Sequence, residues 1–268
     1  MDPAALTQAR AALRDVVPRL AALVRNVPAD SASVGTWAAS DVAAHLAHVL
    51  RFDTDALARG PIPQAVVTTA GMAEFNAQML AEDGERDPAV LADRISTLAG
   101  EFDKVASHSR APVDWLQGVR LPPSVVACHL LEECLIHGDD IAKASGRSWP
   151  IRRDHALLAV EGGALPLIAA LPPAAFLDVE KARSFQARFD LRLRGGGRTL
   201  LVFDRGSLTL EPGPALAVDA HVSADPVAIM RVFIGRQDIW KPILGGKLAA
   251  WGRRPWKLAG MLTAISPP

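Results

Sequence analysis

Apolar residues recur at helical spacing through most of the first two thirds of the chain. They return every three or four positions over residues 6–24, 41–58, 74–80, 88–107 and 154–170, and along a run that follows Pro122-Pro123 and fades near Ser145-Gly146. This period places the apolar side chains on one face of a helix. Proline at the start of a run and glycine at its end are typical helix boundaries. Residues 1–168 therefore predict a helical bundle.

The pattern changes after Pro172-Pro173. Apolar and polar residues alternate over 187–194, 198–204, 208–210 and 217–222, with glycine-containing turns between the first three of these segments. Alternation of period two predicts strands. A helix is expected to begin at Asp225-Pro226, where Asp can cap and Pro can occupy the first helical position. The fold class is α + (α+β), with a helical domain at 1–168 and a small α+β domain at 169–268.

Composition narrows the class of protein. The chain has 268 residues, 50% of them hydrophobic, a formal net charge of zero and no Tyr, so a sizeable core is expected and a nucleic-acid partner is not. No signal-peptide pattern and no membrane-spanning apolar run occurs. Cys128 and Cys134 point about 120° apart on one predicted helix, which disfavours a disulfide. We expect a cytoplasmic protein, monomeric or homodimeric.

Two distant segments carry the candidate chemistry. Glu133 and His137 are four residues apart, so on a helix they share a face at roughly 6 Å. His45, on a separate predicted helix, could complete a site with three protein ligands and an open position, as in catalytic zinc sites. Asp140, three residues after His137, could accept a hydrogen bond from that imidazole or act in acid–base chemistry.

Other interpretations of these residues stay open at this point. A Glu-x-x-x-His pair also occurs on solvated helix surfaces. His48 and His129 could each be a fourth ligand, a proton shuttle or a hydrogen-bonded core histidine, and we favour core or supporting roles. Cys134 is expected to be a small buried apolar residue. The remaining histidines are expected at the surface, namely His108, His155 and His221.

Both segments resemble one family. Trp37-x-x-x-Asp41-x-x-x-His45-Leu46 and Glu133-x-x-x-His137-Gly138-x-Asp140 are similar to the motifs of the mycothiol-dependent maleylpyruvate isomerases, which belong to the DinB-like metal-binding four-helix bundles. The resemblance covers roughly residues 1–165. It implies that His45, Glu133 and His137 bind a divalent metal, typically zinc, and that the open position receives the sulfur of mycothiol or a similar thiol.

Two positions depart from the family pattern. The family often has Ser or Thr after the motif Trp, where it caps the helix that carries the His. This chain has Ala38 there, so we expect Thr36 or Ser40 to supply the cap. The family also commonly has Trp where this chain has Asp139, which would add a negative charge near the metal.

The C-terminal part resembles the sterol-carrier-type domains that accompany many of these bundles. The similar segments are residues 219–226, 229–236 and 245–252. Such a domain could hold an apolar ligand or wall a cleft. Arg236 could bind a substrate carboxylate through its two-pronged donor group, although an exposed arginine is an equally good interpretation. Trp251, Trp256 and the arginines between them are interpreted as domain surface or interface.

Three functions remain. The first is a metal- and thiol-dependent isomerase or S-transferase acting on a small electrophilic substrate, with Asp140 and Arg236 as catalytic candidates. The second is a carrier of a lipid or other apolar ligand. The third is a non-catalytic metal-binding module of a stress response. We favour the first, because metal coordination lowers the pKa of a thiol and the thiolate is the reactive form.

Overall fold

A computed structural model describes residues 3–62, 66–116, 118–213 and 217–266. It contains two compact units. The first comprises Met1–Ala65 and Glu74–Ala164, and the second comprises Val66–Ala73 and Leu165–Pro268. The predicted order, a helical part followed by a part that contains a sheet, is confirmed. The division at 168/169 stays a prediction, and we did not foresee that residues 66–73 group with the second unit.

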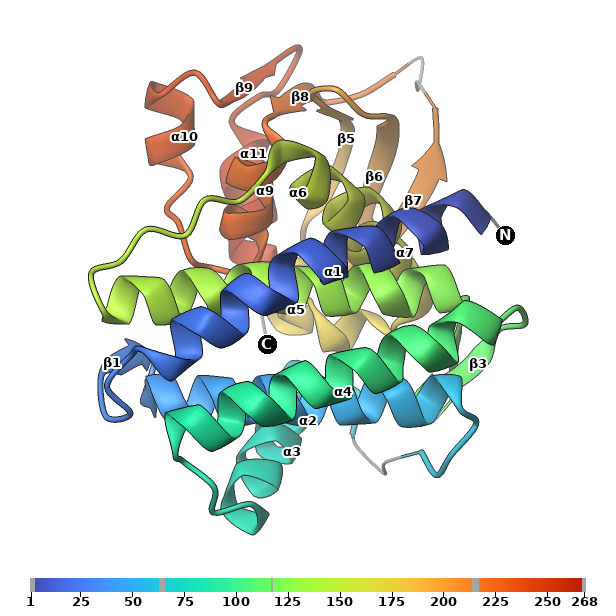
Figure 1. The fold of residues 1–268 in the computed structure, drawn as a ribbon. Coiled ribbons are helices and arrows are strands. Elements are labelled where there is room, and N and C mark those ends of the chain that lie inside the picture. The colour runs from blue at the N-terminus through green and yellow to red at the C-terminus, as the bar shows by residue number, and fades with distance from the viewer. Residues whose placement is uncertain (1–2, 63–65, 117, 214–216, 267–268) are drawn as a thin grey trace. The chain divides into compact units, whose positions relative to one another are not determined.

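Four long helices form the first unit: α1 (Pro3–Arg25), α2 (Ala39–Leu57), α4 (Pro88–His108) and α5 (Pro123–Ala144). α1 packs against α4 and α5, and α2 packs against the same two helices (Figure 1). The shorter α3 (Thr69–Glu82) begins among the residues grouped with the second unit. Large side chains from all four long helices are fully buried, among them Leu20, Leu46, Leu50, Leu91, Ile95, Phe102, Leu130, Leu131 and Leu135. The helical period of the sequence therefore marks the core face of each helix.

The N-terminal ends of α2 and α4 are stabilised in two different ways. At α4, Asp87 accepts hydrogen bonds from the backbone of Ala89 and Val90, and Pro88 occupies the first turn. At α2, the cap residue is Ala38, and no side chain caps the helix in the usual sense. Instead, the carboxylate of Asp41 accepts from the Ala38 backbone at 2.9 Å. The expectation that Thr36 or Ser40 supplies the cap was wrong, because Asp41 at the third helical position supplies the compensating hydrogen bond.

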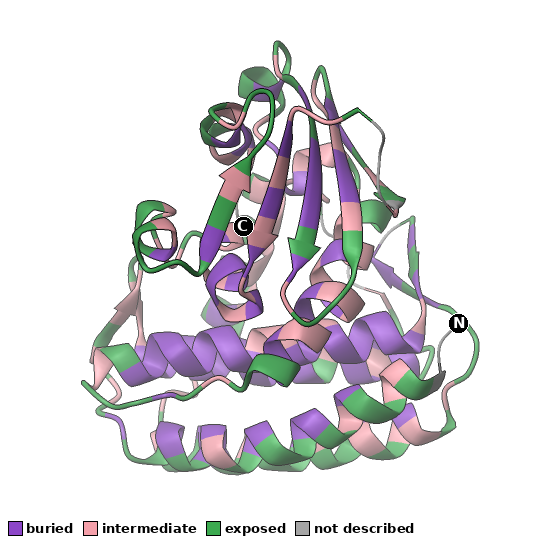
Figure 2. Ribbon diagram, turned by 90° about the horizontal axis from the view of Figure 1, so that it is seen from above, coloured by how far each residue is buried: buried purple, intermediate pink, exposed green. Residues whose placement is uncertain are grey.

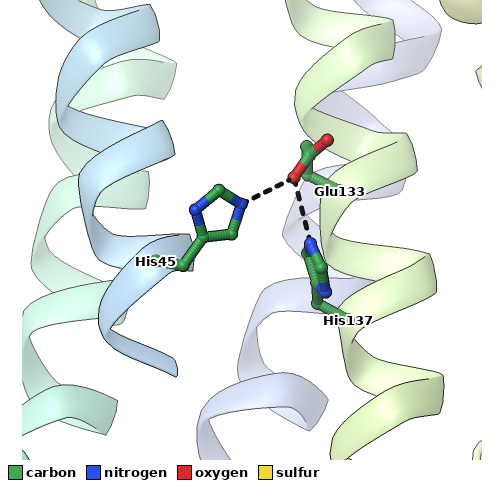
Figure 3. Close-up of side chains that lie close together, drawn as sticks. All are labelled: His45, Glu133 and His137. Atoms are coloured by element: carbon green, nitrogen blue, oxygen red, sulfur yellow. Dashed lines mark hydrogen bonds and ion pairs between the residues drawn. The ribbon is translucent and has the colours of Figure 1, made fainter. Parts of the chain in front are cut away.

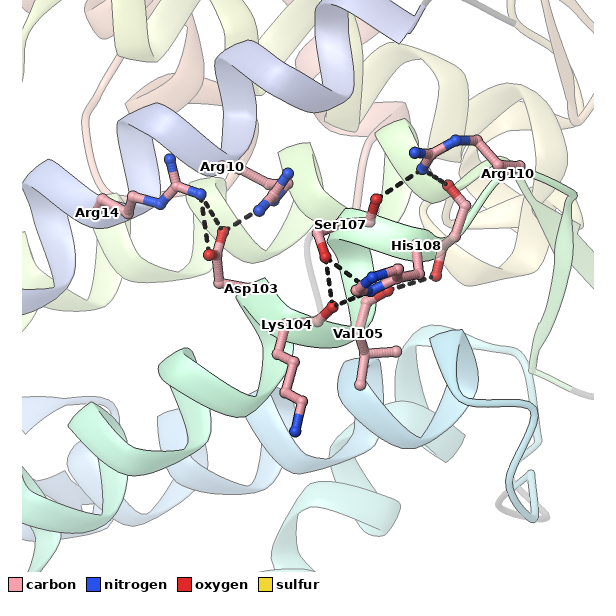
Figure 4. A network of polar contacts seen from close by, with 9 residues as sticks. Arg10, Arg14, Asp103, Lys104, Val105, Ser107, His108 and Arg110 are labelled. Carbon is pink, nitrogen blue, oxygen red and sulfur yellow. Dashed lines mark hydrogen bonds and ion pairs between the residues drawn. The ribbon is translucent and has the colours of Figure 1, made fainter.

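Charged side chains tie α4 to α1 on the outside of the unit. Arg10 and Arg14 of α1 both donate to Asp103 of α4, at 2.8 and 2.9 Å (Figure 4). Partial burial works against the charge of this carboxylate, but the two guanidinium groups lower its pKa. At the end of the same helix, His108 is exposed and its Nδ1 lies 3.0 Å from the Lys104 carbonyl, so the expected surface position of His108 is confirmed.

Close packing at α5 requires glycine at two places in the first unit, Gly138 and the pair Gly162-Gly163. A Cβ at Gly138 would overlap the indole ring of Trp149, whose Nε1 donates to the Leu135 carbonyl of α5 at 2.9 Å. A Cβ at Gly162 would lie 2.6 Å from Cys128 Sγ, and one at Gly163 would lie 2.8 Å from the Cys128 carbonyl carbon. Glycine is needed wherever backbone meets another element this closely.

The helix predicted over 154–170 is present and contains a wider turn at those glycines. It consists of α6 (Arg153–Ala159), a π-helical turn η1 (Val160–Ala164) and α7 (Leu165–Ala170), which follow one another without a gap. The extent of the predicted helix is confirmed, and the π-helical turn that contains the glycine pair lies against α5. His155 of α6 is buried, which corrects its expected surface position.

Two hairpins of the first unit were missed by the sequence analysis. β1 (Ala32–Val34) pairs with β2 (Trp37–Ala38) just before α2, and β3 (Val113–Leu116) pairs with β4 (Val119–Leu121) just before α5. Their strands are too short to show a clear alternation. Each places a Trp beside a histidine. The Trp37 and His45 ring centroids are 5.2 Å apart, and those of Trp115 and His129 are 5.1 Å apart.

The second unit is built on a five-stranded sheet in the order β7-β6-β5-β8-β9. Its strands are β5 (Gln186–Leu193), β6 (Arg198–Asp204), β7 (Ser207–Pro212), β8 (Ala220–Ala224) and β9 (Leu248–Trp251). β5 and β8 run parallel and the other neighbours run antiparallel. Buried residues recur along the strands (Figure 2). The first three predicted strands are confirmed. The fourth lies at 220–224 rather than 217–222, and β9 was not predicted.

Short helices complete this unit: η2 (Pro173–Ala175), α8 (Val179–Ala182), α9 (Pro226–Phe233), α10 (Trp240–Leu244) and α11 (Lys257–Ala264). Asp225 caps α9 by accepting from Val227 and Ala228, with Pro226 at its first position, as predicted. The sterol-carrier likeness of this unit stays a prediction. Among the helices that the structure describes, none has the length and apolar character needed to cross a membrane.

Replacing Gly138 by Ala is expected to lower the free energy of unfolding by about 1–3 kcal/mol, because the methyl group forces Trp149 away from α5. Gly100→Ala in α4 is the matched control, since nothing lies within 4 Å of a Cβ there, and it should stabilise the protein by about 0.5–1 kcal/mol. Chemical denaturation measures both changes. Equal effects of the two substitutions would contradict the packing argument.

Candidate metal centre

The three predicted ligands meet between α2 and α5. His45 comes from α2, and Glu133 and His137 come from successive turns of α5 (Figure 3). Glu133 Oε2 lies 3.3 Å from His45 Nε2 and 3.4 Å from His137 Nε2. One ligand atom from each residue falls within 4.8 Å of the other two. The four-residue spacing on α5 places Glu133 beside His137, and the packing of α2 against α5 brings His45 to them.

The donor set suits a divalent metal such as zinc. Imidazole nitrogen and carboxylate oxygen are both common zinc donors, and a site with three protein ligands retains an open position. His45 and His137 are 7% and 8% exposed, and their ring centroids are 5.0 Å apart. Rings held this firmly need little reorganisation to face one ion, so the residues present fit a metal.

Asp140 holds the other side of the His137 ring. His137 Nδ1 lies 3.1 Å from Asp140 Oδ2, and Asp140 is only 3% exposed. Burial works against protonation of His137, but Asp140 and Glu133 together raise its pKa to about 9. The same contact fixes Nδ1 as the donor and leaves Nε2 toward Glu133, which is the arrangement found for metal-binding histidines. Asp140 is thus placed to orient His137.

The pKa of His45 is shifted in the opposite direction to that of His137. Burial is the largest influence on it and lowers its pKa, although Glu133 works in the other direction. Trp37 covers one side of the ring. A neutral imidazole is the form that binds a metal, so His45 is ready to act as a ligand without losing a proton.

A buried chain of contacts leads away from Glu133. Its Oε1 lies 3.6 Å from His129 Nε2. His129 Nδ1 lies 3.3 Å from Asp53 Oδ2, and Trp115 Nε1 donates to Asp53 Oδ1 at 2.8 Å. Burial is the largest single influence and lowers the pKa of His129, but the charge and hydrogen bond of Asp53, together with the nearby glutamates, raise it to about 9. His129 therefore supports the carboxylate of Glu133 and is not among the three clustered ligands.

Asp53 was missed by the sequence analysis. It is fully buried and lies eight residues after His45 on α2, which is about 80° around the helix from it. A buried face that carries both His45 and Asp53 is the signal that could have identified it. The Trp115 contact had no such signal, because it depends on the β3–β4 hairpin.

His48 is directed elsewhere. Its Nε2 lies 3.3 Å from Asp83 Oδ2. The motif residue Asp41 also lies on this side, where it accepts from Arg86 Nε at 2.7 Å. Arg86 donates further to the backbone carbonyls of Leu80, Asp83 and Glu85. Asp41 thus joins the start of α2 to the segment between α3 and α4, which is a structural role.

Three further residues were singled out by the sequence. Asp139 is buried and lies 2.7 Å from Lys143 Nζ, so its charge has a nearby cation. Cys128 and Cys134 are free and fully buried, and burial raises the pKa of Cys128 to about 12. The expected buried apolar role of Cys134 agrees with this position.

Arg236 and His221 belong to the second unit. Arg236 follows α9, where its Nη1 donates to the Ile234 carbonyl at 3.1 Å. His221 of β8 is partly exposed and its Nδ1 lies 2.6 Å from Asp190 Oδ2. The catalytic role of Arg236 stays a prediction.

Comparisons with known proteins give a family for the first half of the chain and a similar fold for most of it. The sequence model described as "Mycothiol maleylpyruvate isomerase N-terminal domain" matches residues 6–142. No curated protein sequence matches the chain significantly. Among solved structures, the mycothiol-dependent maleylpyruvate isomerase and its histidine-to-alanine variant each align with a TM-score of 0.54 at 15% identity, covering 91% of this chain and 92% of theirs. At this identity the structural likeness establishes a shared fold.

Zinc affinity is expected to depend on pH through His137. Because the metal-free imidazole has a pKa of about 9, zinc must displace its proton below that pH. The apparent affinity should rise about tenfold per pH unit from pH 6 to 8 and level off near the pKa. Competition with a chromophoric chelator measures it.

Asp140→Asn provides the control for that dependence. Loss of the carboxylate moves the pKa of His137 down, so the rise should flatten at a lower pH. An affinity that does not change between pH 6 and 8 in the unmodified protein would contradict the protonated state of His137.

Proposed function

Because this chain belongs to the family of the mycothiol maleylpyruvate isomerase N-terminal domain, we propose that it is a metal- and thiol-dependent enzyme acting on a small electrophilic substrate. The observation that carries the proposal is the convergence of His45, Glu133 and His137 in one cluster, in which both imidazoles are buried. The thiol is mycothiol or a similar low-molecular-weight thiol. The reaction is an isomerisation if the thiol leaves again, or an S-transfer if it stays attached.

His45, Glu133 and His137 would hold the metal. Bound there, zinc would lower the pKa of a thiol and favour its nucleophilic thiolate. Glu133 brings the only negative charge of the three ligands, and His129 holds its second oxygen. Asp140 keeps the Nδ1 proton on His137, which fixes the ring orientation and makes Nε2 the better donor.

Arg236 and Asp140 are the proposed catalytic residues. A guanidinium can bind a carboxylate through two parallel hydrogen bonds, which would orient an acidic substrate such as maleylpyruvate. Asp140 is a carboxylate beside a protonatable imidazole, so it can accept a proton or return one. The fold of the related isomerase, shared over most of both chains, supports a comparable division of tasks here.

Elemental analysis tests the ligands directly. Protein purified without chelators should contain about one zinc or other divalent ion per chain. His137→Ala should lose most of it, and His45→Ala and Glu133→Ala should do the same with helical content preserved. His108→Ala is the matched control and should retain the metal, because His108 is exposed at the end of α4. Full retention in all three ligand variants would refute the assignment.

Activity tests the rest of the proposal. Conversion of maleylpyruvate or a related electrophile should require both mycothiol and metal. Arg236→Lys should raise KM for an acidic substrate roughly tenfold or more, since one point charge replaces a two-pronged donor. Arg192→Lys in the same unit, at an exposed position, should leave KM unchanged. Metal-loaded protein that consumes no thiol-reactive electrophile would favour a non-catalytic binding module.

A further inference from the structure

The second unit exposes an unusual stretch of chain at the edge of its sheet. Residues 239–257, called the Trp-rich segment below, run through α10 and the edge strand β9 to the start of α11. They contain three of the six Trp residues of the protein. Trp240, Trp251 and Trp256 are 63%, 51% and 69% exposed, and Leu244 is 87% exposed. Large apolar side chains are rarely gathered in solvent without a binding partner.

The exposed positions are held outward by the local fold. Within α10, Pro242 is buried while Trp240 and Leu244 face solvent. The chain then turns directly into β9, whose Leu248 is buried against the sheet. α10 contacts β9 (Figure 1). Trp251 stacks on His221 at 5.6 Å between ring centroids and still has half its surface free.

The charge of this segment is entirely positive. It carries Lys241, Lys247, Arg253, Arg254 and Lys257, and no Asp or Glu occurs from residue 239 to the C-terminus. Arg254 and Lys257 pair with Asp219. Lys241, Lys247 and Arg253 have no ion pair among the residues that the structure describes. A neutral protein has thus concentrated unpaired cations beside its exposed tryptophans.

We propose that the Trp-rich segment binds the surface of anionic lipid bilayers. Tryptophan is enriched at the depth of lipid headgroups, because its ring is apolar and its N–H is polar. Exposed leucine enters the acyl boundary, and each nearby Lys or Arg is attracted to anionic headgroups. This is attachment to one face of a membrane, and it does not depend on the metal site or on the proposed enzymatic function.

Two other occupants fit less well. In a symmetric dimer the same patch meets itself, so the unpaired cations of both copies would face one another with no carboxylate from the segment between them. A single-stranded nucleic acid would stack its bases on aromatic rings, which leaves the most exposed large hydrophobic side chain of the segment, Leu244, without a role. Anionic lipid matches the cations, the tryptophans and the leucine together.

Sedimentation of the full-length protein with vesicles tests the proposal. The protein should bind phosphatidylcholine vesicles containing phosphatidylglycerol, and should bind pure phosphatidylcholine at least about tenfold more weakly. Binding should weaken as salt is raised. Two triple variants should each lower the partition coefficient at least about tenfold: Lys241→Glu/Lys247→Glu/Arg253→Glu and Trp240→Ser/Leu244→Ser/Trp256→Ser.

Matched controls lie outside the segment. Val66→Ser/Val90→Ser/Val179→Ser removes three exposed hydrophobic side chains, and Lys104→Glu/Lys181→Glu/Arg183→Glu makes the same change of net charge at exposed positions. Both should bind vesicles as the unmodified protein does, and circular dichroism checks that every variant is folded.

Several outcomes would overturn the proposal. They are the absence of binding to anionic vesicles, binding that the segment variants do not weaken, and binding that the control variants weaken equally. A dimer in light scattering that the segment variants dissociate, without vesicle binding, would assign the surface to a second copy. Binding of single-stranded DNA in place of vesicles would assign it to nucleic acid.

Discussion

The helical unit depends on how one largely buried carboxylate is compensated. Glu133 loses much of its hydration between α2 and α5, which disfavours the charged form, yet its contacts with His45 and His137 hold its pKa well below the ordinary range. Removing one of these imidazoles would weaken but not abolish the compensation, because other histidines still face the carboxylate. The contacts that compensate the charge also place the Nε2 atoms of His45 and His137 around one oxygen of Glu133. The same arrangement therefore serves folding and the proposed metal binding.

The backbone around Glu133 is adapted to keep that arrangement rigid. Two hairpins, one before α2 and one before α5, each place an indole against a histidine of the cluster or its support. Gly138 lets Trp149 reach the backbone of α5, and the glycine pair of the π-helical turn lets a second element lie against the same helix. α5 is thereby held from several sides, as a preorganised ligand set requires.

Charged groups have two kinds of surroundings in this protein. In the first, groups such as Asp53, Asp139 and Asp140 are buried with a hydrogen-bonding or ionic partner, which fixes geometry. In the second, Lys241, Lys247 and Arg253 of the Trp-rich segment are exposed to solvent. Burial makes an ion pair specific for its partner, whereas exposure leaves a charge available to any surface of opposite sign.

Most of the regular elements and the local part of the site could be predicted from the sequence. Helical and alternating periods identified most helices and the first three strands of the sheet, because burial of one face repeats along a regular element. The i,i+4 relation of Glu133 and His137 follows from helix geometry alone, and the family motif supplied His45. Asp41, which also fits that motif, accepts hydrogen bonds from Arg86 and from the Ala38 backbone, which is a structural role. Only the folded protein shows that α2 lies against α5 and that Asp53 and Trp115 support His129. The same holds for the π-helical turn that lets Gly162 and Gly163 approach Cys128. These features join residues far apart in the chain, and such contacts leave no period in the sequence, since they arise only when separate elements pack together.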